Sequence, residues 1–255
     1  MSLYLDLLKR CVSNTVYDDD LDLMRGRFIE KGGRYVSEGG LRVEPQLKYL
    51  GDMWPSKAHT MIGIPRLENL QACIEEVVRN EVSGDFIECG VWRGGASIFM
   101  AGALKIYGLD DSKLWVADSF EGMPKADRVK YPKECELDFD KYQDLSVSLE
   151  EVKRNFTRYG LLDDRVKFLK GWFKDTLPKA PIEKLALMRL DGDLYESTWD
   201  CLTNLYPKLS TGGFVIVDDY NSVKSCTDAV DDFRTQFNVK SELELIQGSG
   251  AYWKK

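Results

Sequence analysis

From residue 85 onward, short apolar runs alternate with segments of helical periodicity. The runs are DFIECG (85–90), LWVADS (114–119), VKFLKG (166–171), LALMRLD (185–191) and GFVIVDD (213–219). In the segments between them, apolar residues recur at the spacing of amphipathic helices. Strands that alternate with helices are typical of a parallel sheet with crossover helices. The pattern therefore predicts an α/β protein whose strands all end at one side of the sheet.

Two of the connecting segments carry more detailed helix signals. In GASIFMAGALKIYG (95–108), Gly102 lies beside an apolar face and is expected to allow close packing on the sheet. SLEEVKRNFTRYG (148–160) opens with Ser148 and Glu151 at the spacing of a capping box and closes at a glycine. Both segments are predicted to be helices that cross over the sheet.

Three regions lie outside this alternation. Residues 1–64 contain an amphipathic helix and a polar connection, and we predict that they form a helical or lid-like extension to a domain of residues 65–255. That domain opens with a further helix over 65–80. Residues 121–146 are long, charged and poor in aliphatic side chains, which is typical of a lid or binding loop. The last segment, 243–255, contains two strand-like pieces around a glycine-containing turn and predicts an antiparallel hairpin.

Composition and charge narrow the class of protein. The chain of 255 residues is 44% hydrophobic and 30% charged, which is typical of a globular enzyme. Its net charge of −7 argues against a nucleic-acid partner. No apolar run reaches the roughly 18 residues that a membrane span needs, and the N-terminus does not resemble a signal peptide. We therefore expect a cytoplasmic protein with neither a membrane nor a nucleic acid as partner.

Histidine and cysteine usage limits the chemistry. The six cysteines include no C-x-x-C pair, so zinc-ribbon and dithiol redox sites are not expected. His59 is the only histidine, which excludes zinc sites built on histidine pairs. A role for His59 as an imidazole base is possible, although a single histidine is more often structural.

The end of the first apolar run, FIECGVWRGGAS, suggests a ligand without phosphate. It lacks the G-x-G-x-x-G spacing that brings backbone against a pyrophosphate. Glu88 instead suggests a positively charged ligand, and Gly90 would permit its close approach. S-adenosylmethionine has an ammonium, a carboxylate and a sulfonium, and Ser97 at the start of the following helix could help to hold the carboxylate. Asp118, with Ser119, ends the second run, where an acid can accept ribose hydroxyls.

Four carboxylates follow two other runs. Asp191 and Asp193 follow the fourth run, which is apolar apart from Arg189, and Asp218 and Asp219 end the fifth. Because the carboxyl ends of neighbouring parallel strands lie at one edge of the sheet, these acids should converge. Adjacent strand residues point to opposite faces, so Asp218 and Asp219 can both converge only if the chain bends there. Clustered carboxylates favour a cation, and oxygen ligands favour Mg²⁺ or Ca²⁺. For Asp193, capping the next helix together with a glutamate three positions on is an equally good interpretation.

With these motifs in place, the chain resembles the macrocin/mycinamicin-type sugar O-methyltransferases over nearly its whole length. The most specific segments are GVWRGGA and GWFKDTLP, supported by AHTMIG, DGDLY and GGFVIVDDY. The resemblance implies a Rossmann-like class I methyltransferase fold, with a mostly parallel seven-stranded sheet, a C-terminal antiparallel hairpin and an N-terminal helical extension. It implies S-adenosyl-L-methionine and Mg²⁺ as cofactors, and dimers or larger homo-oligomers.

The resemblance also implies roles for individual residues. The implied metal ligands are Asp191, Asp218 and Asp219, and Asp193 is the implied general base. Gly171 and Trp172 would border the adenine. Thr60 and Met61 would lie near the methionine end of the cofactor.

The expected reaction is methyl transfer to a hydroxyl of a deoxysugar on a natural product such as a macrolide. The weakest matches, 18–55 and 121–146, are candidate acceptor-binding parts, so the glycoside acceptor is not identified. A phenolic acceptor is the main alternative within the enzyme class, and an aspartate base favours an aliphatic diol over a catechol. A non-catalytic binding subunit is an alternative of another class, whereas an NAD-dependent oxidoreductase would need the tighter glycine loop.

Overall fold

The computed structural model describes residues 2–134 and 138–255, and its centre is a seven-stranded sheet in the order β10-β11-β9-β8-β5-β6-β7. Its strands are β5 (Asp85–Cys89), β6 (Leu114–Asp118), β7 (Val166–Lys170), β8 (Leu185–Leu190), β9 (Leu209–Val217), β10 (Glu244–Leu245) and β11 (Ala251–Lys254). Strands β5 to β9 pair in parallel, β11 pairs antiparallel to β9, and β10 pairs antiparallel to β11. The five apolar runs and the C-terminal hairpin are therefore confirmed.

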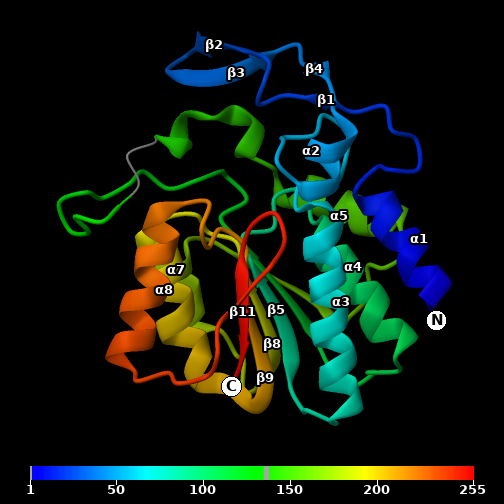
Figure 1. The fold of residues 1–255 in the computed structure, drawn as a ribbon, viewed down its shortest axis with the longest axis vertical. Coiled ribbons are helices and arrows are strands. Elements are labelled where there is room, and N and C mark those ends of the chain that lie inside the picture. The colour runs from blue at the N-terminus through cyan, green and yellow to red at the C-terminus, as the bar shows by residue number, and fades with distance from the viewer. Residues whose placement is uncertain (1, 135–137) are drawn as a thin grey trace.

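Helices cover both faces of the sheet (Figure 1). One face carries α1 (Ser2–Val12), α3 (Gly63–Arg79), α4 (Gly95–Ile106) and α5 (Leu149–Arg158), and the other carries α7 (Tyr195–Leu205) and α8 (Lys224–Gln236). Adjacent strand residues serve opposite cores, since Phe86 packs in the cluster with Phe99 and Phe156, and Ile87 in the cluster with Leu202. Short elements complete this domain: α6 (Phe173–Thr176) and the 3₁₀ turns η3 (Leu177–Lys179) and η4 (Tyr206–Lys208).

Two sequence expectations for these helices can be compared directly with the contacts. Ser148 caps α5, because its hydroxyl accepts the Glu151 N–H at 3.2 Å, as predicted. Gly102 allows close packing, but the element that approaches it is α1 and not the sheet. A Cβ at Gly102 would collide with the side chain of Leu8. The expectation of sheet packing was wrong because α1, which comes far earlier in the chain, occupies that face.

The N-terminal region contains more than the predicted helix. Besides α1 it forms α2 (Pro45–Leu50), a short pair of β1 (Leu21–Asp22) with β4 (Leu41–Arg42), and a hairpin of β2 (Arg27–Lys31) with β3 (Arg34–Glu38). The two-residue loop of this hairpin is Gly32-Gly33, both at positive φ, as such tight turns require. The amphipathic helix of the extension is therefore present, and the polar connection contains two strand pairs that were not predicted. The glycine pair between strand-like flanks was the sequence signal for the hairpin.

The predicted insertion packs beneath this hairpin (Figure 1). It contains the 3₁₀ turns η1 (Phe139–Lys141) and η2 (Gln143–Leu145), while its residues 135–137 lie outside the described part of the chain. The Asp144 carboxylate accepts hydrogen bonds from the amide and hydroxyl of Ser37 at 3.2 and 3.0 Å. Tyr142 contacts the rings of Phe28, Tyr35 and Trp54, with centroids 5.3 to 5.5 Å apart. The insertion and the N-terminal strands thus pack against each other as one unit.

Candidate active site

A cavity of about 310 Å³ opens where β5, β6, β7 and β8 reach their carboxyl ends. The predicted site residues that line it are Gly90, Asp118, Ser119, Gly171, Trp172 and Asp191. The position agrees with the general rule that parallel sheets bind ligands outside the carboxyl ends of their strands. The strand ends, which are far apart in the sequence, therefore share one cavity.

Gly90 has a structural reason to be glycine that the sequence did not reveal. Its φ is 84°, and a Cβ there would overlap the backbone carbonyl of Asp191. The Asp191 N–H also donates to the Cys89 carbonyl at 2.8 Å, so the end of β8 lies directly against the turn after β5. Glycine at this position lets Asp191 reach the cavity.

Asp118 is held in place by the backbone around it. Its carboxylate accepts the N–H groups of Val91 and Phe120 at 2.8 and 2.7 Å, and the Ser119 hydroxyl lies 3.4 Å away. Burial raises the pKa of this carboxyl group, and the backbone hydrogen bonds oppose that rise. The side chain is therefore fixed at the cavity wall, and its contact with ribose hydroxyls remains a prediction.

Glu88 and Ser97 are turned toward partners within the protein. Both are buried, and the Ser97 hydroxyl donates to the Glu88 carboxylate. Arg189 of β8 donates to the other oxygen of Glu88 at 2.6 Å, across a β5–β8 register that places the two residues opposite each other. Neither Glu88 nor Ser97 lines the cavity. Their direct contact with a cofactor remains a prediction, and Arg189 is a partner that the sequence did not indicate.

Three of the four predicted acids converge. Carboxylate oxygens of Asp191, Asp193 and Asp219 all lie within 4.8 Å of one another, a grouping that could hold a metal ion. Burial is the main cause that raises the pKa of Asp191 to about 6 and that of Asp193 to about 8, and repulsion from neighbouring carboxylates adds to both. Burial and the same neighbours also raise the pKa of Asp219. Burial and mutual repulsion therefore disfavour the charged forms of these acids, although Arg189 pairs with Asp191 at 2.9 Å.

Asp218 points elsewhere. Strand β9 ends at Val217 and a turn follows at residues 218–220, but only Asp219 joins the cluster. The two oxygens of Asp218 pair with different arginines, Arg66 of α3 and Arg189 of β8. The metal-ligand role of Asp218 remains a prediction, while its ion pairs are the contacts observed. The sequence showed Arg189 as a basic residue inside an apolar run, but it did not show which carboxylates the arginine pairs with.

The structure does not show the helix-capping role considered for Asp193. The N-cap of α7 is Leu194, and its first-turn amides at Tyr195 and Glu196 donate to the two carboxylate oxygens of Glu134 at 3.0 and 3.2 Å. Asp193 itself has a φ of 53°, a strained conformation for a residue with a side chain. Because Glu134 caps α7, the Asp193 carboxylate does not bind the helix terminus and instead lies in the acidic cluster.

Thr60 and Met61 lie in a loop that packs on the start of α4. The His59 carbonyl accepts the Gly95 N–H at 2.8 Å, and a Cβ at Gly95 would lie only 2.5 Å from that oxygen. Thr60 and Met61 do not line the cavity, so their contact with the cofactor remains a prediction. The imidazole of His59 lies 2.8 Å from the Tyr159 hydroxyl, and burial lowers its pKa to about 4.

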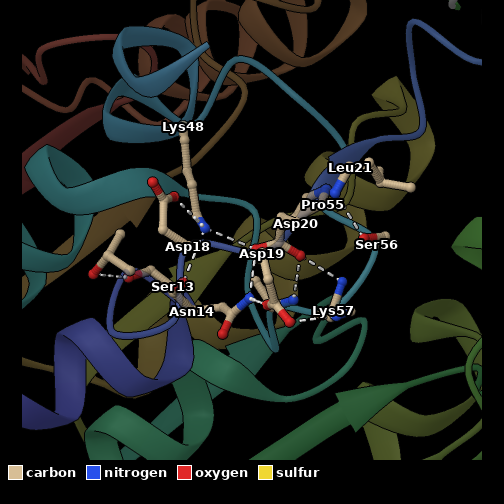
Figure 2. Close-up of polar contacts among 12 residues, drawn as sticks. Ser13, Asn14, Asp18, Asp19, Asp20, Leu21, Lys48, Pro55, Ser56 and Lys57 are labelled. Atoms are coloured by element: carbon tan, nitrogen blue, oxygen red, sulfur yellow. Dashed lines mark hydrogen bonds and ion pairs between the residues drawn. The ribbon is translucent and has the colours of Figure 1, made fainter. Parts of the chain in front are cut away.

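Figure 2 shows what holds this loop from its other side. The buried carboxylate of Asp20 accepts the backbone N–H groups of Lys57 and Ala58 at 2.6 and 3.1 Å. It also accepts from the Asn14 amide at 3.0 Å and pairs with Lys48 of α2 at 2.9 Å. One side chain of the N-terminal extension therefore connects α2, the turn after α1 and the loop that precedes Thr60.

Comparisons with known proteins identify the family of this chain. The family model for macrocin-O-methyltransferase (TylF) matches residues 1–255. The chain belongs to this family. It is 49% identical to demethyldecarbamoylnovobiocin O-methyltransferase of Streptomyces niveus, covering 100% of this chain and 94% of that protein. It is 47% identical to mycinamicin III 3''-O-methyltransferase of Micromonospora griseorubida, covering 100% and 97%. The solved structure of the O-methyltransferase NovP matches with a TM-score of 0.88 and 48% identity, over 100% of this chain and 98% of that one.

Membership in this family confirms the resemblance found in the sequence. The protein is an S-adenosylmethionine-dependent O-methyltransferase with the class I methyltransferase fold. Within the described residues, no helix is long and apolar enough to cross a membrane.

Proposed function

We propose that this macrocin-O-methyltransferase family member methylates a sugar hydroxyl of a glycosylated natural product, with Mg²⁺ as an additional cofactor. The observation that carries the proposal is the carboxylate cluster of Asp191, Asp193 and Asp219, which reaches the wall of the cavity through Asp191. Relatives support the acceptor class, since two of them are named for a mycinamicin and for a rhamnosyl tetracenomycin.

The cavity fits S-adenosylmethionine, which supplies a methyl group already activated on a sulfonium. Asp118 and Ser119 would bind the ribose, and Gly171 and Trp172 would border the adenine, since all four line the cavity. Glu88, two residues before Gly90, is buried and paired with Arg189, so that arginine would offset its attraction for a cationic ligand.

The acidic cluster fits a divalent cation. Its donors are carboxylate oxygens, the ligand type that Mg²⁺ prefers. Arg189 pairs with Asp191, while among the described residues no ion pair reaches Asp193 or Asp219. A bound divalent cation would supply Lewis acidity that lowers the pKa of an acceptor hydroxyl. Asp193 would then accept the hydroxyl proton as the general base, while Asp191 and Asp219 hold the cation.

We further propose that the enzyme acts in the cytoplasm as a homodimer or larger homo-oligomer. The family resemblance supports the oligomer, with the N-terminal extension and the 121–146 insertion helping to cover the acceptor. Light scattering of the purified enzyme would test the assembly, because a monomer at micromolar concentration would contradict it.

The first test is calorimetric titration with S-adenosylmethionine, with and without Mg²⁺. Wild-type protein should bind the cofactor and release heat on addition of Mg²⁺. An Asp191→Asn/Asp219→Asn variant should lose the Mg²⁺ heat, while an Asp110→Asn/Asp111→Asn variant, which removes the same charge from the turn after α4, should keep it. Absence of cofactor binding in the wild type would favour a non-catalytic binding subunit.

A second test identifies the acceptor class. Purified enzyme with S-adenosylmethionine and Mg²⁺ is offered a rhamnoside with a vicinal diol, or a catechol, in separate reactions. Transfer of labelled methyl to the rhamnoside supports the sugar acceptor. Transfer to the catechol alone would support the phenolic alternative.

A further inference from the structure

Helix α7 presents a polar face to the cofactor cavity that no predicted role explains. Ser197 and Asp200 both line the cavity, as does Glu196. Ser197 and Asp200 are three positions apart and therefore share one side of the helix. Glu196 is already engaged, because its carboxylate pairs with Lys130 at 3.2 Å.

The face of α7 that carries Ser197 and Asp200 lies at the end of the cavity lined by Trp172 and Phe173. A Cβ added at Gly192 would lie 3.0 Å from the Ser197 Cβ and 3.4 Å from the Phe173 ring, so glycine brings the start of α7 against α6. Gly171 and Trp172, the residues expected to border the adenine, immediately precede that ring and line the same cavity. The polar side chains of α7 are thus neighbours of the proposed base-binding end.

The two side chains have unused hydrogen-bonding capacity. Among the described residues, no hydrogen bond or ion pair engages the Asp200 carboxylate or the Ser197 hydroxyl. Burial and the neighbouring Glu196 raise the pKa of Asp200 to about 6, while Lys130 and Lys174 oppose the rise. At pH 8 the group is therefore a partly buried carboxylate that accepts hydrogen bonds and donates none.

We propose that Asp200 and Ser197 recognise the purine edge of S-adenosylmethionine and select adenine over its 6-oxo analogue. Adenine carries a donor, the exocyclic amino group, next to an acceptor, N1. A carboxylate beside a hydroxyl is complementary to that pair, because the carboxylate accepts from the amino group and the hydroxyl donates to N1. Hypoxanthine reverses the order, so its carbonyl oxygen would face the carboxylate.

The inference rests on the proposed cofactor and adds two specificity residues to its site. It is tested by binding, at pH 8, of S-adenosylhomocysteine and S-inosylhomocysteine, which differ only at the purine edge. Wild-type protein should bind the adenine ligand about tenfold or more tightly than the 6-oxo ligand. This ratio of dissociation constants is what one hydrogen bond to a charged group typically contributes. Asp200→Asn can donate to the 6-oxo group, so the preference should fall by about tenfold.

A matched control is Asp111→Asn, which removes one exposed carboxylate outside the cavity and should keep the wild-type preference. Ser197→Ala provides an independent variant, expected to weaken adenine binding without favouring the 6-oxo ligand. Wild-type binding without preference, or a preference unchanged in both α7 variants, would overturn this inference and leave the proposed cofactor intact. Failure of the wild type to bind either ligand would instead contradict the proposed cofactor site.

Discussion

Arg189 lies in the middle of the apolar strand β8, and its buried guanidinium contacts three carboxylates. These are Glu88 from β5, Asp191 from its own strand end and Asp218 from the turn after β9. Arg66 adds a second cation on Asp218. Within the described residues, no ion pair reaches Asp193 or Asp219. At the scale of residues, the arginines therefore stabilise the carboxylates that they pair with. Asp193 and Asp219 lie in the same cluster without a cation paired to them.

This charge deficit predicts a dependence of stability on pH and metal. The native protein binds more protons than the unfolded chain because the folded-state pKa values of Asp191 and Asp193 are raised from about 4 to about 6 and 8. Without metal, the free energy of unfolding should therefore fall by about 2–3 kcal/mol between pH 6 and pH 8. Urea unfolding in EDTA measures this change.

Addition of Mg²⁺ at pH 8 should restore the lost stability, since the cation binds the native cluster and replaces the protons. The Asp191→Asn/Asp219→Asn variant is the control and should show a weaker pH effect and no response to Mg²⁺. Stability that rises with pH in EDTA would contradict the assignment of uncompensated charge to this cluster.

Asp193 carries the residue-scale prediction for catalysis. Asp193→Asn keeps the shape of the side chain but removes the base, so kcat should fall by about 10²-fold or more. Calorimetry should show cofactor and metal binding largely intact. Asp175→Asn, at an exposed position of α6 outside the cavity lining, is a control for loss of one carboxylate. Full turnover in Asp193→Asn would exclude the base role.

At the scale of elements, the 121–146 insertion is fastened to α7 and α8. The Glu134 carboxylate caps α7, and the ring of Tyr131 lies on that of Tyr195 with centroids 5.4 Å apart. Lys133 pairs with Asp232 of α8 at 2.6 Å. The first residues of the same insertion line the cofactor cavity. These contacts couple the position of the insertion to one wall of that cavity.

Removal of the Glu134 cap on α7 should weaken the attachment of the 121–146 insertion to that helix. Glu134→Ala leaves the first-turn amides of α7 without a partner, which typically costs about 1 kcal/mol. Hydrogen exchange of residues 121–134 and of the first turn of α7 should become faster, while that of β5 should not change. Glu183→Ala, an exposed acid before β8, is the control, and unchanged exchange in Glu134→Ala would contradict the coupling.

At the scale of the whole molecule, Asp20 joins the N-terminal extension to the methyltransferase sheet. It holds the loop of residues 57–61, which packs on the start of α4, and the Arg93 side chain donates to the Pro55 and Ala58 carbonyls at 3.0 and 2.9 Å. Lys48 also donates to the Asn14 carbonyl at 2.9 Å (Figure 2). The extension is thus bound to the sheet through a buried polar network.

Neighbouring residues of this network allow a matched comparison. Asp20→Asn removes the buried partner of Lys48 and should lower the free energy of unfolding by about 3 kcal/mol. Asp19→Asn should change it little, because the Asp19–Lys57 pair is exposed to solvent. Urea unfolding measures both variants. Equal losses in the two variants would contradict the role assigned to Asp20.

The arrangement of the main domain could be predicted from local patterns because each strand and helix buries one side against a neighbour. The five apolar runs became the five parallel strands, and Asp191 and Asp219 reached one cluster because parallel strands end together. The N-terminal hairpin was missed although Gly32-Gly33 indicated it, since its strands are short and half-exposed and show no strong alternation.

The sequence by itself determined the family, the parallel sheet and the side of that sheet where the acids gather, because motif spacing and hydrophobic periodicity are local properties. Only the tertiary structure decided which partner each charged group has. Glu88 faces Arg189, Asp218 faces two arginines, and Glu134 caps a helix that begins at Tyr195. These pairings join residues far apart in the chain, and they depend on strand register and side-chain direction, which no local pattern encodes.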